Sequence, residues 1–102
     1  MNYEQAIAEL EAEWSPEAGF FWRIRNGDFN AEGFERTLKI LGSLHFDETS
    51  HIPRRIVSLL WYIPIFMQWQ IERAQINGGD INKYSLAADT LHTHIEHLLG
   101  IP

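Results

Sequence analysis

The residues best suited to chemistry lie close together near the C-terminus, in the stretch HTHIEH. Three imidazoles, those of His92, His94 and His97, would make a zinc site if they converged on one point. On a helix they diverge, because successive residues turn by about 100° and His92 falls on a different side from the other two. The better helical triad is Asp89, His92 and Glu96, which are spaced by three and four residues.

Neither set of residues has the spacing of the zinc motif HExxH, and no fourth ligand is indicated. Polar side chains that flank an apolar helical stripe are the simpler interpretation, so we expect no metal and no cofactor. The alternative is a small metal-binding or ligand-binding helical protein, or a remote enzyme, that uses Asp89, His92 and Glu96.

Other catalytic patterns are missing from the sequence. The stretches GFFWRIRNG and INGGD match neither the Walker loop nor the dinucleotide-binding loop. The absence of cysteine removes thiol nucleophiles, cysteine zinc sites and disulfides. No serine lies in a nucleophile elbow, and the following serines have simpler explanations as turn, cap or helix-surface residues: Ser43, Ser50, Ser58 and Ser85. We therefore expect no catalytic residues and no enzymatic activity.

The composition limits the class of protein. With 102 residues, 45% hydrophobic and 22% charged, the chain is expected to form a single helical domain, residues 1–102. The N-terminal residues include no basic stretch followed by an apolar one, so we expect no signal peptide and a cytoplasmic location. The net charge of −6 opposes binding to a phosphate backbone, so we expect no nucleic-acid partner and favour a basic protein partner.

One segment combines cations with aromatic rings, as a platform for single-stranded nucleic acid would. Arg23 and Arg25 lie beside Phe20, Phe21 and Trp22. Two arginines are weak support for such a role in an acidic chain. We expect them instead to pair with carboxylates of the first helix.

Five helical segments follow from hydrophobic periodicity, caps and breakers. They predict an all-α protein, a compact bundle of four to five helices around a central, apolar helix that is kinked by proline. The second segment also alternates like an edge strand, but no second strand is available to pair with it. The expected helices are Asn2 to Trp14; a short one between Ser15-Pro16-Glu17 and Asn26-Gly27; one capped by Asp28 or Asn30 that ends near Gly42; Ile52 to Ile76, capped by Ser50; and Asp80 to just before Gly100.

The fourth helix contains the apolar stretch IVSLLWYIPIFMQW. The run from Ile56 to Met67 would rise only about 18 Å at about 1.5 Å per residue, whereas the core of a membrane is about 30 Å thick, so we expect no membrane association. Pro64 should kink the helix near Leu60. Helical spacing gives a core stripe of Ile56, Leu60, Ile63, Met67 and Ile71, and an opposite apolar side of Trp61, Tyr62, Ile65 and Trp69.

This second apolar side has two explanations. The helix could be central, with other helices covering both of its sides, and this is the simpler interpretation. The four residues could instead be an exposed patch, because tryptophan and tyrosine are enriched at the energetic centres of protein interfaces. Such a patch would bind a foreign partner or form a homodimer.

In size, acidity and lack of catalytic motifs, the chain resembles small helical bacterial immunity and antitoxin proteins. The resemblance implies an inhibitor that covers a functional surface of a basic toxin or nuclease. Our prediction is therefore a non-enzymatic protein-binding module, with a structural homodimer as an alternative. The expected contact residues are Trp61, Tyr62, Ile65 and Trp69, and the acidic residues expected to steer a basic partner are Glu9, Glu11 and Glu13.

Overall fold

The computed structural model describes residues 2–49 and 51–102, and within them the chain forms five α-helices and no strand. The predicted all-α bundle is confirmed. The candidate cap Ser50 lies outside the described residues. The helices are α1 (Tyr3–Trp14), α2 (Phe20–Arg25), α3 (Ala31–Ser43), α4 (Arg54–Asn77) and α5 (Ile81–Leu99).

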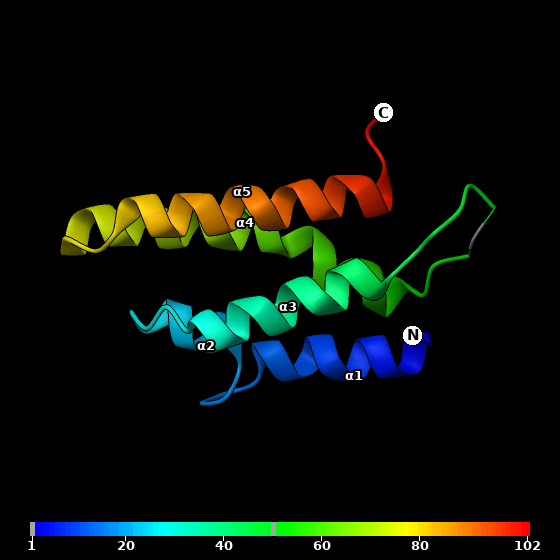
Figure 1. The fold of residues 1–102 in the computed structure, drawn as a ribbon, viewed down its shortest axis with the longest axis horizontal. Coiled ribbons are helices and arrows are strands. Elements are labelled where there is room, and N and C mark those ends of the chain that lie inside the picture. Colours follow the sequence, from blue (N-terminus) through cyan, green and yellow to red (C-terminus); the bar gives the residue numbers. More distant parts are fainter. Residues whose placement is uncertain (1, 50) are drawn as a thin grey trace.

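The helices lie in two layers, with α4 and α5 side by side in one and α1 and α3 in the other (Figure 1). The longest helix, α4, packs on α5 and α1, while α3 packs on α1 and α5 and so closes the arrangement. The short α2 fills the end of the layer formed by α1 and α3. The core lies between the layers, and the molecule measures 45 × 30 × 19 Å.

Most helix boundaries follow from caps that the sequence shows. Three helices begin at a side-chain oxygen that accepts a backbone N–H in the first turn, which satisfies a donor that the helix itself leaves free. The helix α4 ends at Gly78, whose φ of 75° is a left-handed conformation that glycine adopts without strain. The three caps are Asn2 to the N–H of Gln5, Asn30 to Gly33 and Asp80 to Lys83.

The predicted start of the second helix is wrong. Ser15 ends α1 instead, because its hydroxyl donates to the carbonyl of Ala12 at 2.6 Å. The chain then turns, and α2 begins at Phe20, directly after Gly19. Any Cβ at Gly19 would collide with the backbone of Glu13, so this close approach requires glycine.

The predicted core stripe of α4 is confirmed, but burial of its opposite side is wrong. Ile56, Leu60, Ile63 and Met67 are all 0% exposed, and Ile71 is partly buried. The other side is open because α5 and α1 cover only the core side of the helix. Pro64 lies inside α4, and the ribbon bends along this helix in Figure 1. No helix of residues 2–49 and 51–102 is long and apolar enough to cross a membrane.

We predict that Leu60→Ala lowers the free energy of unfolding by about 2–5 kcal/mol, because it leaves a cavity where a fully buried side chain was. Urea unfolding followed by circular dichroism measures the change. The matched control is Leu86→Ala, since Leu86 is 69% exposed, and it should change stability by no more than about 0.5 kcal/mol. Equal effects of the two substitutions would contradict the assigned core.

Candidate functional site

The open side of α4 carries a group of apolar residues that we call the aromatic face: Trp61, Tyr62, Ile65 and Trp69. Trp61, Ile65 and Trp69 are 52%, 41% and 48% exposed. Tyr62 is partly buried and its ring lies edge-on to both tryptophans, 5.6 Å from Trp61 and 5.9 Å from Trp69 between centroids. The three rings therefore form one connected surface.

The aromatic face is anchored to the core through Tyr62. The Tyr62 ring lies 6.0 Å from that of Trp14 and 6.5 Å from that of Phe66. Trp14 in turn stacks on Phe21 at 4.2 Å, so the short α2 supports this side of α4. Rings that are already ordered lose little conformational entropy when a partner covers them.

One pocket borders the aromatic face, and a second lies farther along α4, between its C-terminal half and α2. The first has a volume of 340 Å³ and is lined by residues that include Trp61, Tyr62, Arg55 and Arg25. The second, of 390 Å³, is lined by residues that include Arg25, Arg73 and Gln70. Arg25 lines both pockets and therefore lies between them.

The expected pairing of Arg23 and Arg25 with the first helix is wrong. Arg23 pairs with Asp28 at 2.8 Å, directly after its own helix. The guanidinium of Arg25 lies 5.6 Å from the centre of the Phe66 ring, a cation–π distance. Two carboxylates of α1, those of Glu13 and Glu11, pair instead with Arg36 and Arg55.

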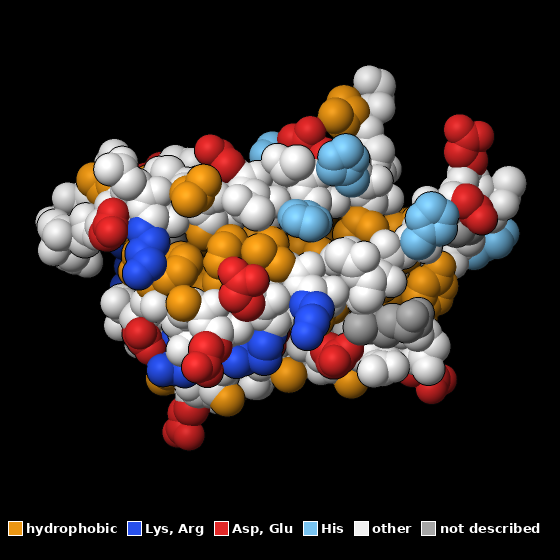
Figure 2. All heavy atoms as spheres, in the orientation of Figure 1, with side chains coloured by type: hydrophobic (Ala, Val, Ile, Leu, Met, Phe, Trp, Pro, Cys, Tyr) orange, Lys and Arg blue, Asp and Glu red, His pale blue; other side chains and the backbone are white. Residues whose placement is uncertain are grey.

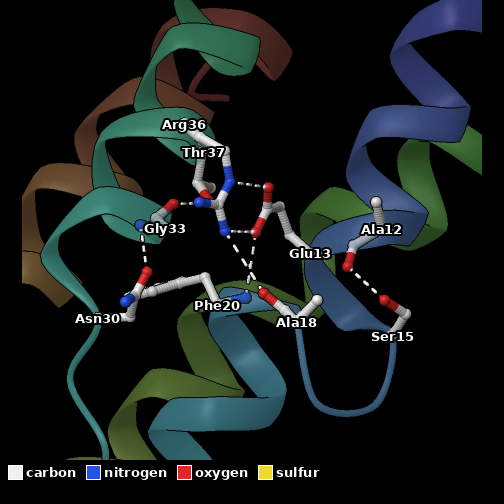
Figure 3. Close-up of polar contacts among 9 residues, drawn as sticks. All are labelled: Ala12, Glu13, Ser15, Ala18, Phe20, Asn30, Gly33, Arg36 and Thr37. Atoms are coloured by element: carbon white, nitrogen blue, oxygen red, sulfur yellow. Dashed lines mark hydrogen bonds and ion pairs between the residues drawn. The ribbon is translucent and has the colours of Figure 1, made fainter.

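Glu13 is a buried carboxylate that accepts three hydrogen bonds, and Figure 3 shows its surroundings. Its carboxylate is 5% exposed and accepts from Arg36 twice, at 2.9 Å from Nε and 3.1 Å from Nη2. It also accepts the backbone N–H of Phe20 at 3.1 Å, so it joins α1, α2 and α3. Hydrogen bonding to this carboxylate raises the pKa of Arg36 above its ordinary value, against the opposing effect of burial.

The expected row of exposed acidic residues is thus largely engaged within the chain. Glu13 is buried and serves the fold. Glu11 is exposed but pairs with Arg55 at 2.9 Å. Glu9 is partly buried, and its Oε2 atom has no hydrogen-bond partner among the described residues. Little of the row is left to steer a basic partner.

The histidine cluster does not assemble into a metal site. His92 Nε2 lies 3.3 Å from Glu96 Oε1, one turn along α5. Within the described part of the chain no three histidine, aspartate or glutamate side chains are placed to hold a metal ion. Figure 2 shows the histidines gathered toward the end of the molecule that carries the C-terminus.

Sequence reasoning missed the arginines beside the aromatic face. Arg55 and Arg73 lie about five turns apart on α4, on the same side of the helix as Tyr62, and this spacing is readable from the sequence. Arg25 could not be placed in this way, because it belongs to another helix. Only the packing of α2 against α1 brings it to this edge.

We predict that Glu13→Gln lowers the free energy of unfolding by about 1–3 kcal/mol, because the amide loses the charge and cannot accept all three hydrogen bonds. Denaturant unfolding measures the loss. Glu11→Gln is the matched control, since the pair with Arg55 is exposed and should be worth less than about 1 kcal/mol. A cycle with Arg36→Gln should show coupling to Glu13, and additivity would contradict the assigned contact.

We also predict that zinc leaves the melting temperature of the untagged protein unchanged, because His92 and Glu96 form only a pair. The same should hold for His92→Ala. Differential scanning calorimetry with zinc and with a chelator tests this. A melting temperature that rises with zinc in the native protein but not in His92→Ala would revive the metal-binding alternative.

Comparison with known proteins finds no matching family model, no matching curated protein and no matching solved structure.

Proposed function

We propose that this chain is a non-enzymatic protein-binding module and that the aromatic face of α4 is its binding surface. The observation that carries the proposal is the exposure of Trp61, Ile65 and Trp69 on one side of a single helix, at 52%, 41% and 48%. Large apolar side chains that gather at the surface are costly in water and mark interaction sites. Tryptophan and tyrosine are also the residue types that dominate binding energy in interfaces.

The arrangement of the face supports binding rather than chance exposure. Tyr62 links Trp61 to Trp69 and is itself held by Trp14 and Phe66. A partner would therefore meet a surface whose rings are already in place, which reduces the entropy cost of association. The face lies along a helix, so a second helix could cover it by packing its own side chains between these rings.

The other candidate functions have less support. A metal-dependent activity of Asp89, His92 and Glu96 would require convergent ligands, and only His92 and Glu96 are in contact. A basic toxin or nuclease as the partner is supported only by the net charge of −6, because Glu11 and Glu13 are engaged within the chain. A homodimer through the same face is the competing arrangement.

We predict that Trp61→Ala and Trp69→Ala each weaken partner binding by about 2 kcal/mol or more and leave the fold intact. The native protein, tethered by its C-terminus, is used to capture a partner from cell extract, and a protein counts as a partner only if the double alanine variant fails to retain it. Binding constants are then measured by calorimetry, and folding is checked by circular dichroism.

Leu86→Ala is the matched control, because it removes an exposed apolar side chain, 69% accessible, from α5. It should bind the partner as the native chain does. If the tryptophan variants unfold, the aromatic face belongs to the core and the proposal is wrong. Unchanged affinity in both tryptophan variants would also overturn it.

A further inference from the structure

We infer that the partner segment that covers the aromatic face is acidic, and that its carboxylates pair with three arginines along one edge of that face. We call Arg25, Arg55 and Arg73 the arginine edge. This inference rests on the proposed function, and it names the chemistry of the partner that the proposed function leaves open. It is opposite in sign to the basic partner that the net charge suggests.

The position of the arginine edge follows from helix geometry and the two pockets. Arg55 and Arg73 lie on the same side of α4 as Tyr62, about five turns apart. Arg25 reaches the gap between them from α2, because it lines one pocket with Arg55 and the other with Arg73. The three arginines therefore lie along the side of α4 that faces α2, next to the aromatic face.

The charge of the arginine edge is poorly neutralised within the chain. Neither pocket has an aspartate or glutamate among its lining residues. Arg25 and Arg73 form no ion pair with any described carboxylate, and Arg55 shares only the exposed Glu11. In a chain with 14 acidic and 8 basic residues, this is a local reversal of charge.

The helix dipole does not account for Arg55 and Arg73, although it favours Arg25 at the end of α2. Arg55 lies in the first turn of α4, where a positive charge opposes the helix dipole. Arg73 lies before the last turn of α4, so the favourable end of the dipole does not explain it. Arg25 ends α2 and packs over Phe66, which leaves its N–H groups able to donate to a carboxylate.

A protein segment fits this surface better than a nucleic acid does. The face offers two tryptophans and an isoleucine beside the cations, which suits an amphipathic helix with apolar residues on one side and carboxylates next to them. A phosphate backbone would have to approach a chain with a net charge of −6.

A second copy of this chain is poorly matched in charge. In an antiparallel contact between two α4 helices, the two-fold axis runs across the helices, and each arginine edge would lie against the other. In a parallel contact Arg73 would lie near Glu72, the one carboxylate that α4 itself carries, toward the opposite edge. Repulsion in the first case, and unpaired cations in the second, favour a foreign acidic segment.

The test is a selection of binding peptides from a random displayed library on the native protein. Peptides that also bind the Trp61→Ala/Trp69→Ala variant are removed. We expect the remaining peptides to be enriched in aspartate and glutamate next to large apolar residues. The affinity of a selected peptide should fall about fivefold in Arg25→Gln/Arg73→Gln, the size expected of exposed ion pairs, and should fall further with salt.

The matched control is Lys39→Gln/Lys83→Gln, which removes the same charge from α3 and α5 and should leave the affinity unchanged. Peptides that depend on the tryptophans but are neutral or basic would overturn the inference and leave the proposed function standing. If no selected peptide depends on the tryptophans, both fail. A dimer in sedimentation that Trp69→Ala abolishes would make a second copy the occupant and overturn the foreign acidic segment.

Discussion

The carboxylate of Glu13 is the contact on which the arrangement of the first three helices depends. It receives two hydrogen bonds from Arg36 of α3 and one from the first N–H of α2, at the last turn of α1. Burying a carboxylate costs free energy unless its oxygens accept hydrogen bonds. Losing the contacts to Arg36 or to the N–H of Phe20 would therefore destabilise this arrangement of helices. The backbone at Gly19 passes so close to the backbone of Glu13 that no side chain fits between them, and this brings the start of α2 next to the end of α1.

The position of α2 helps to determine which side of α4 is covered and which is exposed. With Phe21 stacked on Trp14 and both rings against Phe66, the first layer supports one flank of α4 and leaves the next flank open. In this two-layer arrangement α4 packs mainly on α5 and α1, which cover its core side. The apolar side chains of Trp61, Ile65 and Trp69 are therefore left at the surface, where an additional helix from a partner would complete the packing.

The local distribution of charge differs from what the negative net charge of the chain suggests. Two of the glutamates of α1 are paired by arginines from α3 and α4, so the most acidic segment of the sequence is partly neutralised. Of the cations beside the aromatic face, Arg25 and Arg73 form no ion pair with a described carboxylate and Arg55 has only the exposed Glu11, so a net charge of −6 coexists with a positive edge. Binding responds to the charges near the contact, because salt screens those beyond about 10 Å.

Sequence alone predicted five helices, the starts of two of them at Asn30 and Asp80, and the core stripe of α4, because these depend on local spacing and on residues a few positions apart. It also identified Trp61, Tyr62, Ile65 and Trp69 as a second apolar side. Tertiary structure alone decided that this side is open, that Glu13 is interior, and that Arg25 joins the edge formed by Arg55 and Arg73. The exposure of a side chain and its ion pairs depend on which helices pack together. The periodicity of the sequence shows how residues are distributed around one helix, but not which helix packs against each side.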